Sequence, residues 1–506
     1  MRRVRTLAPF LLFLTLPLLA QDLASIEKRV TVRKLDNGLT LIIMERHEAP
    51  VFSNTTVVNV GSAQEVPGIT GLAHMFEHMA FKGSENVGAT NYDAERTALQ
   101  KVEEAYAAYD IERRKTVGHD DAKVAQLEKA WKDATAAADK YVVPEEFSRI
   151  IGQAGGVGVN AGTNNDETIY FCSLPSNRLE LWAFLESERF LHPVFREFYK
   201  ERDVVTEERR VSVESRPQGR LREEFLSTAF KAHPYRSPVV GWPSDLKTFS
   251  ATDAAAFFKK YYVPSNMVIA VVGDVNPAES LPLFEKYFGR LPKAPAPEPL
   301  RTIEPPQTAE RTVVLREKSQ PIYYEGYHRP AATDPDDAVY DVISLLLSGG
   351  RTSHLYRSLV RDKKIAATAN ASSLPGGKYP PLFFFSAVTT PGHTPAEITA
   401  AIAEEIDKLK NQDVTPDELQ SVKTRVKAGL LRQLDSNAGM AFELALTQTL
   451  FGDWRELFGQ IDRIDKVTAA DIRRVANQTF NVNNRTIAYI DNAQPSQKSA
   501  AKGGAQ

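Results

Sequence analysis

A stretch of this sequence recurs 218 residues further along the chain, and this duplication limits the possible folds more than any other feature. The first copy covers residues 249–272 and the second covers residues 467–490. The matched positions are Asp253 with Asp471, Asn266 with Asn484, and Ile269-Ala270 with Ile487-Ala488. Each copy predicts a capped helix, a short turn at the asparagine and a closing strand. A chance likeness of a common helix–strand unit is the alternative, but the copies end stretches of similar length, which favours two homologous halves.

The first half predicts strands that pair and helices that cover them. Asp36-Asn37-Gly38 is a hairpin-type turn between β-rich runs, and a further strand near residues 53–60 leads into a helix. The predicted fold class is therefore α+β, with two mixed domains in which an antiparallel-rich sheet is covered by helices.

Prolines mark the boundary between the halves. Four of the nine residues in the segment 291–299 are proline, and Pro305-Pro306 follow. Such a density of proline keeps a segment extended and semi-rigid, so we expect a linker at residues 291–310. The predicted organisation is a signal peptide at 1–20, an N-terminal domain at 21–290, a C-terminal domain at 311–493 and a disordered polar tail at 494–506.

The start of the chain has the pattern of an export signal. Arg2, Arg3 and Arg5 precede an apolar run at residues 7–19, which is too short for a membrane span, and Ala20 is a small residue at the expected cleavage point. The single cysteine, Cys172, excludes an internal disulfide and predicts a small buried side chain. We expect a periplasmic or secreted protein, and the net charge of -2 favours neither nucleic acid nor anionic membrane as a partner.

The predicted helix of the first half carries the motif His-x-x-Glu-His. His74 and His78 are one helical turn apart, so both imidazoles face the same way and can bind one divalent metal. Glu77 can then reach a water on that metal and take its proton. Thr70 is the expected N-cap and Gly83 the expected stop. Two surface histidines are the alternative, but the apolar neighbours predict a buried helix, in which these polar groups need a partner.

A catalytic zinc site needs a third protein ligand. Residues 198–210 predict a helix in which Glu201 and Glu208 are seven positions apart and share one face. Glu207 points roughly 120° away from Glu201, given 3.6 residues per turn. A solvated acidic face is the alternative, and we prefer it for Glu207.

Several motifs resemble the pitrilysin/insulinase family of metallopeptidases, called M16, in the bacterial branch that is similar to mitochondrial processing peptidases. The resemblance covers nearly the whole mature chain. Its further matches are Gly61-Ser-Ala-Gln-Glu65, Lys82-Gly-Ser84, Asn160-Ala161 with Thr163, Glu201-Arg-Asp-Val-Val205, His233-Pro-Tyr-Arg236 with Gly241, Tyr262-Val-Pro-Ser-Asn266 with Gly273-Asp274, and Ser348-Gly-Gly-Arg-Thr-Ser353 with Leu355.

The resemblance implies roles for these residues. His74, His78 and Glu208 are the implied ligands of one zinc ion, Glu77 the implied general base and Glu201 a supporting carboxylate. It also implies two halves that together form a clam-like half-chamber, with metal bound in the first half alone.

Substrate binding in the family resembles strand addition to a sheet edge. The matching edge here is the glycine-rich segment 155–162, which contains Asn160 and Ala161, followed by the strand 167–172. An extended peptide that pairs with this edge gains affinity with little sequence preference. A tight bend is the alternative for the glycines.

The chain departs from the family in two places. His78 and Glu208 are 130 residues apart, and the excess length at residues 93–144 predicts a helical hairpin with a turn at Gly118-His119-Asp120. This insertion could gate the chamber, dock a partner or be a surface decoration. His119 is not an expected ligand.

The second departure concerns the substrate clamp. Arg361 fits an arginine that family members use to hold the substrate backbone, but Thr368 stands where a tyrosine is expected. In some bacterial relatives a metal-free sister chain supplies this pair, so a sister subunit or a homodimer is the expected partner beside the peptide substrate.

The sequence therefore predicts a zinc-dependent endopeptidase that cleaves peptides or unfolded segments. The alternative is a non-catalytic peptide-binding or scaffold subunit, which should have a degraded motif, whereas all motif residues are present here. A serine or cysteine hydrolase lacks support because the chain has no Gly-x-Ser-x-Gly elbow and Cys172 has no activating neighbours.

Overall fold

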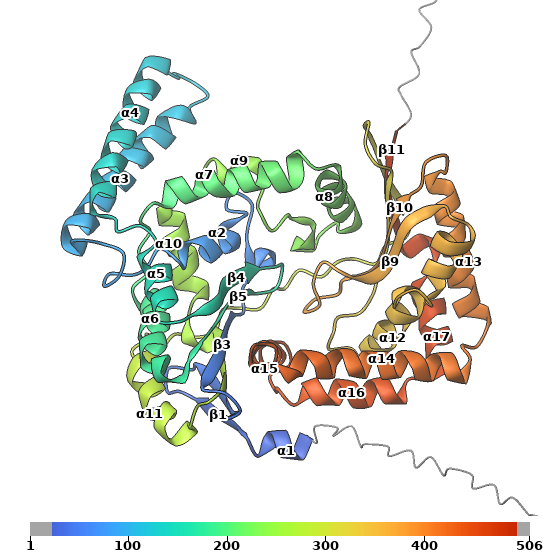
Figure 1. Cartoon of the computed structure of the whole chain (residues 1–506). Helices are drawn as coiled ribbons and strands as arrows, with labels where there is room; N and C mark the ends of the chain where they lie inside the picture. Colours follow the sequence, from blue (N-terminus) through green and yellow to red (C-terminus); the bar gives the residue numbers. More distant parts are fainter. Residues whose placement is uncertain (1–22, 493–506) are drawn as a thin grey trace, which may run out of the picture.

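The computed structural model describes residues 23–492 as two halves, each built on one sheet (Figure 1). The predicted signal peptide, residues 1–20, and the predicted tail, residues 494–506, lie outside the described residues. No helix in the described part combines the length and the apolar character that a membrane span requires.

The first sheet has six strands in the order β1-β2-β6-β3-β5-β4. The strands are β1 (Val30–Lys34), β2 (Thr40–Glu45), β3 (Val51–Val58), β4 (Val157–Thr163), β5 (Thr168–Pro175) and β6 (Met267–Gly273). Only β2 and β6 pair in parallel. The turn between β1 and β2 contains Gly38 at φ 101°, a conformation that favours glycine. Strand β4 forms one edge, as the glycine-rich segment predicted.

The second sheet repeats this arrangement in the order β7-β11-β8-β10-β9. The strands are β7 (Arg311–Arg316), β8 (Ile322–His328), β9 (Ala366–Leu374), β10 (Leu382–Thr389) and β11 (Arg485–Asp491). Again one pair, β7 with β11, is parallel and the others are antiparallel. The predicted α+β class with two homologous domains is therefore confirmed.

The helices of the first half are α1 (Leu23–Glu27), α2 (Leu72–Met79), α3 (Tyr92–Arg113), α4 (Asp121–Ala138), α5 (Glu146–Gln153), α6 (Leu179–Leu191), α7 (Phe198–Arg209), α8 (Pro217–Ala229), α9 (Pro243–Leu246), α10 (Ala251–Tyr261) and α11 (Pro277–Phe288). Those of the second half are α12 (Asp337–Ser348), α13 (Pro395–Asn411), α14 (Pro416–Asp435), α15 (Asn437–Phe451), α16 (Glu456–Lys466) and α17 (Ala469–Thr479). The sequence repeat corresponds to α10 with β6 and to α17 with β11.

A capping box explains why aspartate recurs in both copies of the repeat. Ser250 caps α10 and accepts from the backbone of Asp253, whose side chain binds back to the cap. Thr468 and Asp471 make the same reciprocal pair at α17. Each box satisfies two amide groups that the first helical turn leaves without partners.

One face of each sheet is covered by a helix that comes from the other half. Helix α15 packs on β3 and β6 of the first sheet, where Leu444 and Ala445 join a core with Val57 and Val272. Helix α8 packs on β7 and β11 of the second sheet. Figure 1 shows α15 beside β3 of the first sheet and α8 facing the second sheet. Burial of apolar surface therefore holds the halves together.

The segment 291–310 contains neither helix nor strand. It lies against the first half, because the Glu304 carboxylate accepts hydrogen bonds from the backbone N–H groups of Lys231, Ala232 and His233. The linker and domain limits that we proposed from the proline pattern stay a prediction.

Helices α3 and α4 form a hairpin that projects from the first half (Figure 1). The two ends of the hairpin lie side by side on the first half, where Ala89 and Val142 pair as an antiparallel bridge. Gly118 has a positive φ in the turn, and Asp120 caps α4. His119 is exposed and contacts Asp121.

Candidate metal centre

Helix α2 begins differently from the sequence prediction. Thr70 is not the N-cap; its hydroxyl donates to Asp245 Oδ2 at 2.7 Å and accepts from the Trp242 N–H. The N-cap is Gly71, with φ 95°, and a Cβ there would lie 2.9 Å from the Val240 carbonyl oxygen. The prediction was wrong because this close approach of a distant loop requires glycine at the cap position.

Glu65 takes over the capping role. Its carboxylate accepts from the N–H groups of Gly71 at 2.9 Å and Ala73 at 2.7 Å. Burial raises the pKa of Glu65 to about 8, although the two backbone donors oppose the shift. Glu65 therefore fixes the start of α2 and, with it, the direction in which the motif side chains point.

Three side chains from α2 and α7 converge. His74 Nε2 lies 3.7 Å from Glu208 Oε2, and His78 Nε2 lies 3.4 Å from the same oxygen. One ligand atom from each residue falls within 4.8 Å of the other two. Within residues 23–492 this is the group of histidine and acidic side chains that has the spacing for a metal ion.

The donor set fits zinc. Ligand atoms about 2.0–2.2 Å from a tetrahedral zinc ion are about 3.4 Å apart. Glu208 Oε2 lies at close to this separation from His74 Nε2, at 3.7 Å, and from His78 Nε2, at 3.4 Å. Two imidazole nitrogens and one carboxylate oxygen form the ligand set of a catalytic site that keeps its fourth position open. His74 is buried, whereas the Glu208 side chain is 46% exposed, so one side of the group faces solvent.

Two further carboxylates lie beside this group. Glu77 Oε2 is 3.9 Å from His74 Nε2, and its side chain is 21% exposed. Glu201 lies on the other side, with Oε2 at 3.4 Å from His78 Nδ1. A carboxylate at the second ring nitrogen of a ligating histidine fixes its tautomer and orientation. Glu207, as expected, points away and pairs with Arg210.

The charges of the group are coupled. Burial disfavours the charged form of His78, but hydrogen bonds to Glu201 and Glu208 outweigh it and raise the pKa of His78 to about 9. Burial lowers the pKa of His74. The hydrogen bond with His78 lowers the pKa of Glu208. A carboxylate that is ionised at neutral pH is the form that binds a cation.

Lys82 belongs to the motif Lys82-Gly-Ser84, and the structure gives it a contact that the motif did not predict. Its ammonium group lies 2.6 Å from Glu201 Oε1 and 2.9 Å from Glu197 Oε2. Lys82 thus holds Glu201 in place behind His78. The signal in the sequence was a lysine four residues after the second histidine, but its partners come from a helix more than a hundred residues away.

The predicted substrate-binding residues lie in different places. Asn160 is exposed and Ala161 is buried on β4, which packs beside α2. Arg361 is not brought to the metal group: it pairs with Asp362 and lines a depression of about 900 Å³. Residues of the second half alone border that depression. Thr368 is exposed on β9.

Two stretches of the chain match models of known protein families. Residues 41–110 match the family model described as Insulinase (Peptidase family M16), and residues 248–426 match the model described as Peptidase M16 inactive domain. The fold and these matches define a two-domain α+β peptidase-like protein. Each half of the chain therefore matches a domain model of the M16 family.

Named relatives are similar along most of their length. The chain is 27% identical over 470 residues to a protein of Helicobacter pylori called zinc protease PqqE, covering 90% of this chain and 91% of the relative. It is 22% identical over 456 residues to the uncharacterized zinc protease YmxG of Bacillus subtilis, covering 88% and 94%.

Solved structures share the fold. A crystal structure of a protease from Helicobacter pylori superposes with a TM-score of 0.77 at 26% identity and covers 91% of this chain and 99% of that one. The periplasmic protease PqqL from Escherichia coli gives a TM-score of 0.67 at 19% identity, with 92% of this chain aligned to 48% of PqqL.

Proposed function

We propose that the protein is a zinc-dependent endopeptidase. The observation that carries this proposal is the convergence of His74, His78 and Glu208 on one point, with the Glu77 carboxylate beside it. His74 Nε2, His78 Nε2 and one Glu208 oxygen would hold the ion. Zinc, when bound, supplies a water of lowered pKa and polarises a carbonyl.

The chain's own residues account for the proton transfers. Glu77 accepts a proton from the attacking water at a carboxylate oxygen and passes it to the nitrogen of the leaving amine. Glu201 accepts a hydrogen bond from His78 Nδ1 and keeps Nε2 directed toward the group. Burial would raise the pKa of Glu201, but its interactions with His78 and Lys82 outweigh burial and lower that pKa.

Strand β4 supports binding of an extended peptide. It is the terminal strand of its sheet, so its outer edge has no partner strand among the described residues. It also packs beside α2, which carries Glu77. A peptide that adds to this edge uses backbone hydrogen bonds, and short or unfolded segments supply them most readily.

Cleavage of a quenched fluorescent peptide library tests the proposal. We expect turnover that EDTA abolishes and that added zinc restores, because the three donors bind the ion reversibly. The match of residues 248–426 to a domain described as inactive favours one rival, a non-catalytic peptide-binding or scaffold subunit. Peptide binding without cleavage by the zinc-loaded chain would support that rival and contradict the peptidase.

We also propose a partner chain. Thr368 cannot supply the aromatic hydroxyl that the family resemblance implies, and Arg361 lies in a depression away from the metal group. A sister subunit or a second copy that supplies an arginine–tyrosine pair should raise the rate of peptide cleavage. The hypothesis fails if the chain, monomeric by size exclusion, cleaves at a rate that no co-purified sister chain increases.

A further inference from the structure

Helix α3 of the projecting hairpin is bonded to the segment that carries the metal-site carboxylates. Three links connect them, each between side chains: Glu95 with Arg196, Glu103 with Tyr199, and Tyr106 with Arg202. Tyr199 and Arg202 stand on either side of Glu201 in α7. The hairpin is therefore joined to the place where α7 faces α2.

The first link is fully buried. Glu95 and Arg196 are 0% and 1% exposed, and Arg196 Nη2 lies 2.8 Å from Glu95 Oε2. The same guanidinium donates to the carbonyl oxygens of Lys82, Ser84 and Val87. Arg196 thereby fixes the loop that leaves α2 and positions the Lys82 backbone.

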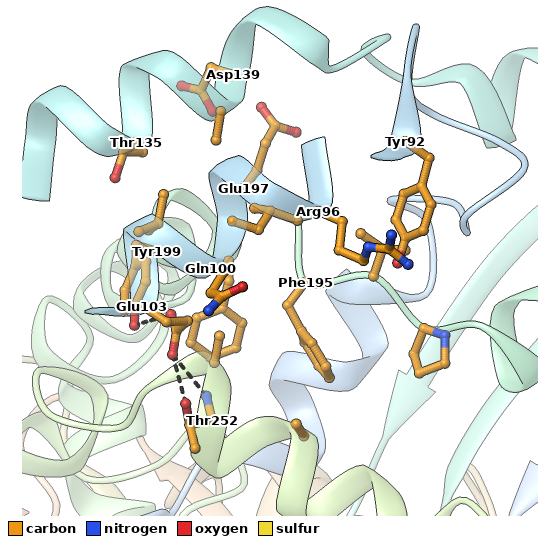
Figure 2. A pocket seen from close by; sticks show the side chains of 18 residues that line it. Tyr92, Arg96, Gln100, Glu103, Thr135, Asp139, Phe195, Glu197, Tyr199 and Thr252 are labelled. Atoms are coloured by element: carbon orange, nitrogen blue, oxygen red, sulfur yellow. Dashed lines mark hydrogen bonds between the residues drawn. The ribbon is translucent and has the colours of Figure 1, made fainter. Parts of the chain in front are cut away.

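Figure 2 shows the second link at the wall of a cavity. The Glu103 carboxylate accepts from the Tyr199 hydroxyl at 2.6 Å, and from the N–H and hydroxyl of Thr252 at 3.1 and 2.9 Å. The cavity between α3, α7 and α10 has a volume of about 310 Å³. Glu103 thus connects α3 with both α7 and α10 along this wall.

The third link lies one residue beyond Glu201. Arg202 Nη1 donates to the Tyr106 hydroxyl at 2.7 Å, and its guanidinium lies over the Tyr106 ring. The rings of Tyr106 and Tyr199 are 4.3 Å apart between centroids. Tyr199 and Arg202, which stand before and after Glu201 in the sequence of α7, are thus both held by α3.

We propose that Glu103 and Tyr106 of α3 are positioning residues of the metal centre, which set α7 so that Glu201 and Glu208 meet the two histidines. This inference rests on the proposed function, since it assigns the hairpin a part in holding the zinc ligands. The sequence left three roles open for the hairpin: a gate, a docking site or a surface decoration. We propose instead that it holds α7 in position, and we call this role a brace.

Zinc affinity, measured by competition with a chromophoric chelator, tests the brace. Glu103→Ala should weaken zinc binding about tenfold, at the lower end of what outer-shell partners contribute. Glu103→Gln, which keeps an acceptor oxygen for the Tyr199 hydroxyl, should recover most of that loss. Glu104→Ala is the matched control, because the Glu104 carboxylate on the same helix pairs with exposed Gln100.

Tyr106→Phe is the second variant, since it removes the hydroxyl and keeps the ring. It should also bind zinc more weakly while its near-ultraviolet circular dichroism and melting temperature match those of Glu104→Ala. Zinc affinity equal to the wild type in folded Tyr106→Phe and Glu103→Ala would overturn the brace alone. A wild-type chain that binds no zinc would instead contradict the proposed function.

Discussion

Glu77→Gln is expected to leave zinc bound and to reduce peptide turnover about 10²- to 10⁴-fold, the range that a general base contributes. Glutamine has nearly the shape of glutamate, but its amide cannot accept the proton of the attacking water. Glu77 lies beside His74 Nε2 and is partly exposed, so the substitution leaves the packing of α2 intact. Turnover is measured with the fluorescent peptide at equal zinc content.

Glu207→Gln is the control for this experiment. Glu207 lies one residue from Glu208, is exposed and pairs with Arg210, so its loss should leave turnover unchanged. Wild-type turnover in Glu77→Gln would show that another group takes the proton, and the assigned base would be wrong.

Glu208→Gln is expected to lose the metal itself. A neutral amide no longer offers the anionic oxygen that lies 3.4 Å from His78 Nε2, and the loss should exceed the roughly 10–100-fold effect of an outer-shell partner. Elemental analysis after dialysis should find well under one zinc ion per chain in this variant. His74→Ala and His78→Ala should behave alike. Full zinc in Glu208→Gln would place the third ligand elsewhere.

Local spacing sufficed to predict one part of the site. His74, Glu77 and His78 lie within one turn and a half of a helix, so their common direction follows from helix geometry. The pairing of Glu201 and Glu208 on one face also followed from periodicity. Which metal ligands that face would meet was implied by the family resemblance, because 130 residues separate His78 from Glu208.

Contacts between distant segments were beyond prediction. Thr70 looked like a cap because its residue type suits one, but Gly71 meets the Val240 carbonyl and Glu65 supplies the acceptor. The sequence likewise did not predict that α8 and α15 each pack on the sheet of the other half. An amphipathic helix shows that it is buried, but its sequence does not show which sheet it covers.

The repeat shows which residues of the second half correspond to the two carboxylates of α7. Helices α7 and α14 begin 218 positions apart, at Phe198 and Pro416, so Leu419 and Val426 occupy the positions of Glu201 and Glu208. Both side chains pack against the core of the second half. Apolar side chains have replaced the carboxylates there, and the second half contributes packing and surface instead of donors.

Anomalous diffraction at the zinc absorption edge, from crystals grown with zinc, is the most direct test of the metal assignment. We expect one strong peak between His74 Nε2, His78 Nε2 and the Glu208 carboxylate, about 2.0–2.2 Å from each ligand atom. Zinc found only at other places, or no peak among these three side chains at full zinc supply, would contradict the assignment.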